Sequence, residues 1–175
     1  MISRIKTKIK LRELTLSDVN KTYQEWMNDS EIFKFSKQSN KKHSLKEIKE
    51  FVSGKKKSKS EFLYKILIYE NKKNKHMGNI KLGPINFENK TADISYFIGE
   101  KNYWDRGITT KAIKEIINLA KKKFKLKKLQ AGHWEKNIAS RKVLLKNKFK
   151  LEGILKSQIQ TKKGRVDRYL YGLII

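Results

Sequence analysis

A long one-sided helix that follows three strands is the sequence feature that most constrains the fold of this chain. Between residues 108 and 124, apolar side chains recur at helical spacing on one stripe, and lysines cover most of the remaining surface. The stripe consists of Ile108, Ala112, Ile113, Ile116, Ile117, Ala120 and Phe124. Such a stripe must pack against another apolar surface. We expect a sheet, because residues 91–98 alternate between apolar and polar side chains shortly before the helix.

The same periodicities give the order of the other elements. Strands are expected at residues 8–16, 62–69, 77–82, 91–98, 129–133, 153–160 and 167–175. Helices are expected at residues 16–27, 44–52, 108–124 and 137–148, and Ser53-Gly54 is expected to end the second of them. The order βααβββαβαββ predicts one mixed α/β (α+β) domain over residues 1–175. Its sheet is expected to be mixed and mostly antiparallel, with about six to seven strands and helices on both faces.

Composition excludes several classes of protein. The chain has no cysteine, which excludes a disulfide scaffold, a thiolate zinc site and a cysteine nucleophile. No apolar run approaches the ~18 residues that a membrane span needs, and residues 1–6 show no signal-peptide core. We therefore expect a cytoplasmic protein without a membrane partner. Three scattered histidines predict no metal site, and His43 and His76 are expected to be solvated in lysine-rich turns.

The net charge of +26 raises the question of a nucleic-acid partner. Only six of the 43 basic residues are arginines, and the lysines are spread along the chain. Proteins that read nucleic acids usually concentrate arginine and interleave aromatic side chains. We interpret most of this charge as solvated surface and expect no nucleic-acid partner. A field this positive still attracts anionic ligands at low salt.

The loop before the long helix is the first candidate site. Gly107 lets the backbone approach a ligand closely, and the free N–H groups of the following helical turn favour an anion. Arg106 adds a full positive charge. This arrangement suits a pyrophosphate, although neither G-x-G-x-x-G nor G-x-x-x-x-G-K-[ST] is present. A glycine before a helix is also ordinary loop chemistry.

A second candidate segment opens the helix at residues 137–148. Asn137 fits an N-cap, and Ser140 lies one turn further on, on the neighbouring face.

Together these segments resemble the GCN5-related N-acetyltransferase superfamily, and within it the ribosomal-protein-alanine acetyltransferase-like branch. Residues 103–112, Tyr-Trp-Asp-Arg-Gly-Ile-Thr-Thr-Lys-Ala, are similar to the family's acetyl-CoA loop. The family's Asn-x-x-Ser helix followed by Lys-x-Gly-Phe-x-x-Glu-Gly is similar to the segment with Asn137, Ser140, Lys146, Phe149, Glu152 and Gly153. A Trp-x-Asn-Asp segment of this branch resembles Trp26-Met27-Asn28-Asp29, and the resemblance covers residues 9–172.

The chain departs from the family pattern at three places. Thr109 replaces the second Gly or Ala of the loop, where its side chain either weakens cofactor affinity or donates to a phosphate. Asn147-Lys148 replaces the usual x-Gly before Phe149. Leu145 occupies the position of a tyrosine that protonates the leaving thiolate in many members, so the resemblance does not imply that mechanism here.

The resemblance implies transfer of an acetyl group from acetyl-CoA, the co-substrate, to a primary amine. The acceptor would be a small molecule, such as an amino sugar with or without a nucleotide, or a protein N-terminus. The pantetheine arm would pair with the backbone of Tyr96, Phe97 and Ile98. The pyrophosphate would rest on the N–H groups of Arg106, Gly107, Ile108, Thr109 and Thr110. Asn137 would bond the pantetheine arm, and Ser140 would give the leaving thiolate a proton or a hydrogen bond.

Several residues are candidates for the base and the acceptor pocket. His133 is the first choice for acid–base work, because its ordinary pKa suits neutral pH, although it also fits a strand end without contacts. Asp93 and Glu135 are the alternative bases. If they are not catalytic, Asp93 is expected to pair with a lysine on the neighbouring strand, and Glu135 is expected to be a loop or capping charge. Aromatic side chains that could wall the acceptor pocket are Trp26, Phe33, Phe35 and Trp134, of which Trp26 also fits a helix core stripe.

Two hypotheses from other classes remain open at this point. One is a basic nucleic-acid-binding module on a degenerate acetyltransferase fold, and the other is a catalytically inactive acetyl-CoA sensor. The oligomeric state, monomer or homodimer, is also open. The last strand is apolar to its end and either completes the core or pairs across a dimer.

Overall fold

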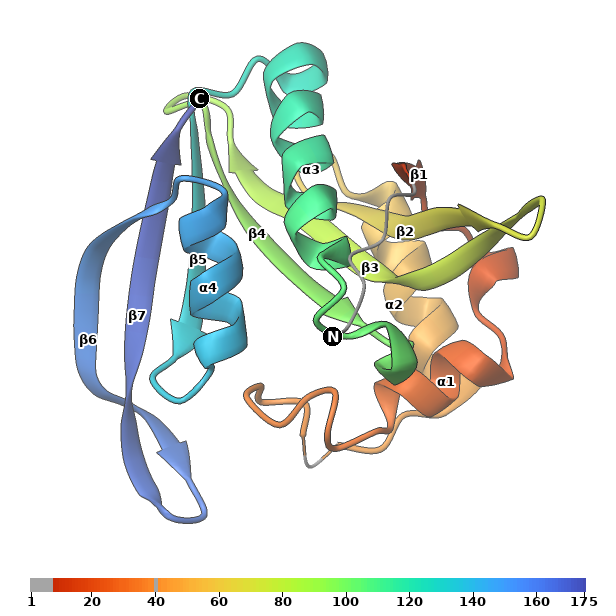
Figure 1. Cartoon of the computed structure of the whole chain (residues 1–175), viewed down its shortest axis with the longest axis horizontal. Coiled ribbons are helices and arrows are strands. Elements are labelled where there is room, and N and C mark those ends of the chain that lie inside the picture. Colours follow the sequence, from red (N-terminus) through yellow and green to blue (C-terminus); the bar gives the residue numbers. More distant parts are fainter. Residues whose placement is uncertain (1–7, 40) are drawn as a thin grey trace.

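A computed structural model describes residues 8–39 and 41–175 of the chain (Figure 1). The strands are β1 (Ile9–Glu13), β2 (Phe62–Glu70), β3 (Lys73–Asn86), β4 (Thr91–Ile98), β5 (Lys128–Trp134), β6 (Lys150–Thr161) and β7 (Gly164–Ile174). The helices are α1 (Lys21–Met27), α2 (Leu45–Lys57), α3 (Ile108–Phe124) and α4 (Ile138–Lys146), with short 3₁₀ turns η1 (Leu16–Asp18) and η2 (Lys101–Tyr103). The predicted order of strands and helices is confirmed. None of the helices in the described ranges is long and apolar enough to cross a membrane.

The seven strands form one sheet in the order β1-β2-β3-β4-β5-β7-β6. Every neighbouring pair is antiparallel except β4 and β5, which are parallel. The helix α3 connects these two strands, as a parallel pair requires. The predicted mixed and mostly antiparallel sheet is therefore confirmed.

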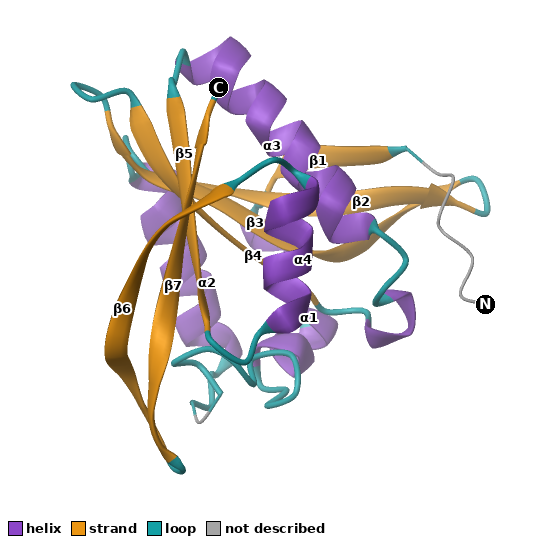
Figure 2. Cartoon of the chain, turned by 60° about the vertical axis from the view of Figure 1, so that its left-hand side comes forward, coloured by secondary structure: helices purple, strands orange, loops and turns teal. Residues whose placement is uncertain are grey.

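Helices cover both faces of the sheet (Figure 2). On one face, the buried stripe of α3 packs on the alternate residues Ala92, Ile94 and Ile98 of β4, and α4 lies beside it against β5. On the other face, α1 and α2 bury Tyr23, Trp26, Ile48 and Val52 against the neighbouring strands. The apolar stripe of α3 thus packs on an apolar sheet face, as its sequence predicts.

The parallel strands β4 and β5 pair over only part of their length. Their register joins Thr91 to Lys128, Ala92 to Leu129 and Asp93 to Gln130, and it ends there. Both strands continue, β4 to Ile98 and β5 to Trp134, but they diverge (Figure 1). Over its remaining length, β4 pairs only with β3, and β5 pairs only with β7. The sheet consequently has an opening between residues 94–98 and 131–134.

Three expected boundaries were wrong. The helix expected over residues 16–27 begins only at Lys21, because Val19 and Asn20 are extended and separate the 3₁₀ turn η1 from α1. Helix α2 continues past Ser53-Gly54 to Lys57, because the site of a Gly54 side chain is open space and three lysines in the last turn suit the negative helix end. Strand β3 continues past Gly83-Pro84, since a register shift between Leu82 and Ile85 accommodates this dipeptide.

The C-terminal strand completes the core. β7 lies between β5 and β6, and Tyr171 is buried within the main apolar cluster.

Candidate functional site

Backbone groups of β4 face the opening in the sheet. The N–H of Gly99 donates to the carbonyl of Met77 on β3 at 2.8 Å. Because bonding direction alternates along a strand, the groups of Phe97 also face β3, and those of Tyr96 and Ile98 face the opening. The carbonyl of Ile98 accepts from Trp104 Nε1 at 3.0 Å. The opening therefore presents free strand edge at Tyr96, and Trp104 ties the following loop to the strand end.

The start of α3 lies at one end of this edge. Gly107 is the N-cap and adopts φ 82°, the left-handed region that favours glycine, and a Cβ at this position would have no neighbouring atom within 4 Å. The N–H groups of the first turn have no acceptor within the helix and lie at its positive end. Ile108 is buried there, whereas Thr109 and Thr110 are partly buried. This geometry fits an anionic group such as a pyrophosphate.

A polar cluster supports the loop before α3. Arg106 lies over the ring of Tyr103, with 5.0 Å between its guanidinium carbon and the ring centroid. Lys75 lies over the same ring at 4.5 Å and forms an ion pair with Glu100 at 3.1 Å. The Tyr103 hydroxyl donates to the carboxylate of Glu70 on β2. The β2–β3 hairpin thereby holds the loop that carries Arg106.

Helix α4 contributes two of the predicted residues on the same face. The Asn137 side chain caps the helix, since its Oδ1 accepts from the N–H of Ser140 at 3.0 Å. The Ser140 hydroxyl is 2.9 Å from the Tyr96 hydroxyl of β4, so a hydrogen bond joins the helix to the strand edge. Burial raises the pKa of Tyr96 to about 12, while the bond to Ser140 opposes this. Tyr96 is therefore a neutral phenol at physiological pH.

The opposite face of the sheet holds a cleft of about 570 Å³ over β4, β5 and β7. Its polar walls include Lys81, Asp93, Ser95, Gln130, Glu152 and Arg168. Gly132 leaves room for the Arg168 side chain, because a Cβ there would lie 3.1 Å from Arg168 Nε. Asp93 and Gln130 form the last paired position of β4 and β5. The cleft therefore begins where the opening begins.

Ion pairs occupy two of the four charged residues in the cleft. Lys81 Nζ is 2.7 Å from Glu61 Oε1, and Glu152 Oε1 is 2.8 Å from Lys128 Nζ.

The predicted acid–base residues lie in three different places. Asp93 lines the cleft and is exposed. His133 is only 4% exposed and faces the α4 side, stacked between Tyr169 and Tyr171 with ring centroids 5.4 and 5.3 Å away. Its Nδ1 is 2.7 Å from the carbonyl of Trp134, and its buried Nε2 has no partner among the described residues. Glu135 is exposed in the turn after β5, where its N–H donates to the carbonyl of Asp167.

The aromatic residues predicted to wall an acceptor pocket are also separated. Phe33 is buried against Phe97, on the cleft face of β4, with ring centroids 5.1 Å apart. Trp26 packs directly on Gly99, where any side chain would collide with its ring, so it belongs to the core of α1. Phe35 is partly buried beside Lys34, and Trp134 is partly buried opposite Arg168 of β7.

The Trp-x-Asn-Asp segment has a structural explanation. Asn28 bonds both backbone groups of His43, accepting from its N–H at 2.7 Å and donating to its carbonyl at 2.9 Å. Asp29 forms an ion pair with Lys101 at 2.8 Å. The segment thus ties α1 to the loop before α2 and to the turn after β4.

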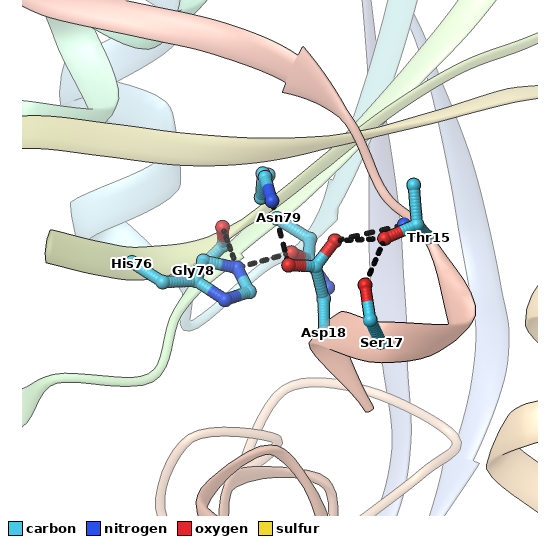
Figure 3. Close-up of polar contacts among 7 residues, drawn as sticks. Thr15, Ser17, Asp18, His76, Gly78 and Asn79 are labelled. Atoms are coloured by element: carbon cyan, nitrogen blue, oxygen red, sulfur yellow. Dashed lines mark hydrogen bonds and ion pairs between the residues drawn. The ribbon is translucent and has the colours of Figure 1, made fainter. Parts of the chain in front are cut away.

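His76 is not solvated as expected. Its Nε2 is 2.8 Å from Asn79 Oδ1 and 3.1 Å from the carbonyl of Gly78, so it carries the proton (Figure 3). Asn79 in turn donates to the Tyr23 hydroxyl at 2.7 Å. The ring lies edge-on to Trp26, and burial lowers the pKa of His76 below its ordinary value. His43 is partly buried and bonds Gln38.

The departures near Phe149 also have visible consequences. Lys148 adopts φ 67°, a left-handed conformation in which glycine is favoured. Asn147 is buried; its nitrogen donates to the carbonyl of Val143 at 3.0 Å, and its Oδ1 has no partner among the described residues. Leu145 is 49% exposed on α4.

The structure adds one contact and one residue that the sequence did not predict. Tyr96 was expected to contribute its backbone alone, yet its hydroxyl contacts Ser140. Arg168 was not a candidate, although a rare arginine in a lysine-rich chain was an available signal. The described ranges contain no group of three or more His, Cys, Asp or Glu side chains that could hold a metal ion.

Comparison with known proteins relates this geometry to a family. A model of the acetyltransferase (GNAT) domain family matches residues 8–150. The uncharacterized N-acetyltransferase p20 of Bacillus licheniformis is 28% identical over 98 residues, which are 56% of this chain and 54% of that protein. The chain therefore matches about half the length of this curated relative.

Solved structures share the fold over nearly the whole chain. RimL, a ribosomal L7/L12 alpha-N-protein acetyltransferase in complex with coenzyme A, superposes with a TM-score of 0.85 at 21% identity, covering 99% of this chain and 97% of that one. The spermidine N-acetyltransferase from Vibrio cholerae, in complex with coenzyme A and spermine, superposes with a TM-score of 0.84 at 16% identity, covering 95% of both chains.

Proposed function

Because this chain belongs to the acetyltransferase (GNAT) domain family, we propose that it transfers an acetyl group from acetyl-CoA to a primary amine. One observation carries the proposal: the opening between β4 and β5 joins an anion-binding helix start on one face to a polar cleft on the other. A long anionic thioester can therefore enter from one side of the sheet, and an amine can reach it from the other.

Residues on the α3 and α4 face fit acetyl-CoA, which supplies the acetyl group as a thioester. The first-turn N–H groups of α3, with Arg106 beside them, would hold the pyrophosphate. The outward backbone groups of Tyr96 and the N–H of Ile98 would pair with the pantetheine arm as an added strand does. Asn137 uses its Oδ1 on its own helix, so its amide nitrogen is the group that would donate to that arm.

Tyr96 and Ser140 would handle the leaving sulfur. The buried phenol of Tyr96 keeps its proton and would donate it in the 2.9 Å hydrogen bond that joins the two hydroxyls. The Ser140 proton is then directed away from Tyr96, and Ser140 would donate it in a hydrogen bond to the thiolate that forms as the carbon–sulfur bond breaks. This arrangement supplies a donor although α4 has Leu145 at the position where many members have a tyrosine.

Asp93 would receive the proton that the ammonium acceptor must lose before it attacks. Its carboxylate is exposed in the cleft at the edge of the opening. His133 faces the other side of the sheet and is enclosed by two tyrosines, and Glu135 lies in the turn beyond β5. Position therefore favours Asp93 over His133 and Glu135.

The acceptor would be a small amine, such as an amino sugar, or a protein N-terminus. The structural neighbours are named for spermidine and for a ribosomal protein N-terminus, both of which are amines.

Calorimetric titration with acetyl-CoA at ~150 mM salt, where exposed charges are screened beyond about 8 Å, tests the cofactor half. Gly107→Asp and Gly107→Asn form a matched pair, because both side chains tolerate the left-handed conformation and only one is negative. We expect one-site binding that Gly107→Asp weakens at least about tenfold more than Gly107→Asn, a step of roughly 1.4 kcal/mol. Equal affinities of the two variants would contradict a pyrophosphate on this turn.

Release of free thiol in the presence of amines then tests the transfer. An inactive acetyl-CoA sensor would bind without turnover. A nucleic-acid module would instead bind polyanions with an affinity that falls steeply as salt rises.

A further inference from the structure

The cleft holds two charged groups of opposite sign that the protein leaves without partners. Lys81 and Glu152 are engaged in ion pairs with Glu61 and Lys128. The side chains of Asp93 and Arg168, in contrast, form no hydrogen bond or ion pair with the described residues. Unpaired charges that face one concave site mark places where a ligand supplies the partner.

The position of Arg168 is set by the sheet beneath it. Arg168 pairs with Trp134 across β5 and β7, and its side chain extends along the sheet over Gly132. A Cβ at Gly132 would lie only 3.1 Å from Arg168 Nε, so the guanidinium lies directly on this glycine. A larger residue at position 132 would displace it. An exposed guanidinium that lies on the sheet in this way suits a carboxylate or a phosphate, which it can bind through two parallel N–H bonds.

Sheet geometry sets the spacing of the backbone positions beneath the two charges. Asp93 is opposite Gln130, and Gly132 lies two residues further along β5. Strand spacing of about 4.8 Å and a rise of about 3.3 Å per residue place Asp93 and Gly132 about 8 Å apart. A ligand that contacts both charges must therefore carry its cation and its anion at separate ends of its skeleton.

From these observations we infer that the acceptor is a zwitterion, with its primary amine at Asp93 and an oxyanion, carboxylate or phosphate, at Arg168. This inference rests on the proposed function, because it identifies the amine in the cleft as the group that is acetylated. The positive net charge of +26 adds to the attraction of the anionic end. A polyamine would place a second cation against Arg168 and is disfavoured by the same arrangement.

Steady-state kinetics with matched amines tests the inference. 6-Aminohexanoate presents an amine and a carboxylate at a comparable separation, hexylamine lacks the anion, and 1,6-diaminohexane replaces it with a cation. Comparison of kcat/KM for glucosamine 6-phosphate with that for glucosamine provides the same test for a phosphate. We expect kcat/KM for a zwitterion to exceed that for its counterpart without the anion by about 10- to 100-fold, the range for a charge-assisted hydrogen bond or pair of bonds.

Arg168→Gln is the decisive variant, and Arg165→Gln is its control. Arg165 is exposed on the same strand, and its guanidinium donates to the carbonyl of Ser157 at 2.8 Å, outside the cleft. Arg168→Gln is expected to abolish the preference for the zwitterion, while Arg165→Gln retains it. Equal use of 6-aminohexanoate and hexylamine by the wild-type protein, together with equal use of the phosphate pair, would overturn the inference. Equal losses in both variants would also overturn it, because they indicate net charge alone.

Calorimetry without acetyl-CoA separates this inference from the proposed function. If the cleft binds zwitterions, 6-aminohexanoate or glucosamine 6-phosphate binds the wild-type protein and Arg165→Gln but not Arg168→Gln, even if no acetyl transfer occurs. If amines are acetylated and neither zwitterion binds in preference to its counterpart, the transfer activity stands and the zwitterionic acceptor is refuted.

Discussion

The hydrogen bond between Tyr96 and Ser140 makes a quantitative prediction about catalysis. If Tyr96 orients the Ser140 hydroxyl toward the leaving sulfur, Tyr96→Phe removes one neutral hydrogen bond of 2.9 Å and keeps the ring. Such a bond contributes about 0.5–1.5 kcal/mol. We therefore expect kcat to fall about 2- to 12-fold at saturating substrates, with little change in the KM for acetyl-CoA.

Ser140→Ala removes the donor itself. A hydrogen bond to a charged group contributes about 1.5–3 kcal/mol, so the loss in kcat should be about 10- to 150-fold. Because Tyr96 acts through Ser140, Tyr96→Phe should have no additional effect in the Ser140→Ala background. The double-mutant cycle measures this coupling directly.

Thiol release at saturating acetyl-CoA and amine is the assay, and thermal unfolding of each variant reports whether the fold is intact. A purely structural role of Tyr96 predicts the same fold-loss with and without Ser140, and an increase in KM. Either result would refute the positioning argument.

Three further predictions concern stability. Lys148→Gly should raise the free energy of unfolding by about 0.5–1 kcal/mol, because it relieves the φ of 67°, whereas Lys146→Gly, inside α4, should lower it by about 1 kcal/mol. Denaturant unfolding of both variants measures these changes. A lower free energy of unfolding for Lys148→Gly would contradict backbone strain at Lys148. Asn147→Leu should raise the midpoint of thermal unfolding, since the buried Oδ1 without a partner costs about 1–3 kcal/mol and one local bond is lost in exchange. A lower midpoint would show that this oxygen is satisfied. Burial raises the pKa of Tyr64 to about 12 from 10.0, so the unfolded chain loses this proton first and stability falls as pH rises from 10 to 12. Tyr64→Phe should reduce this loss of stability, measured as the free energy of unfolding in urea at each pH between 10 and 12. An unchanged dependence on pH would contradict the raised pKa of Tyr64.

Local patterns were sufficient to predict most of the fold. The bounds of α3 and β4 follow from apolar spacing within each segment, which depends only on neighbouring residues. Helix α2 was predicted too short because Gly54 and the following lysine run were interpreted as the helix end. A glycine with open space around it only weakens a helix and does not end it.

The candidate site was less predictable because its geometry depends on strand neighbours. Alternation in β5 places His133 in phase with Leu129 and Ala131, and this signal could have assigned its ring to the buried face. No local pattern shows that β4 and β5 stop pairing after Asp93. The cleft and the contact of Arg168 with Gly132 follow from that separation and from the position of β7.

The opening between β4 and β5 has a kinetic consequence for the proposed reaction. Because the thioester and the amine approach from opposite faces, neither molecule has to leave before the other arrives. The two substrates then react in a ternary complex, without an acetylated enzyme, and lines in double-reciprocal plots intersect instead of running parallel. Each product departs by the face through which its precursor came, so the acetylated amine should inhibit competitively against the amine but not against acetyl-CoA.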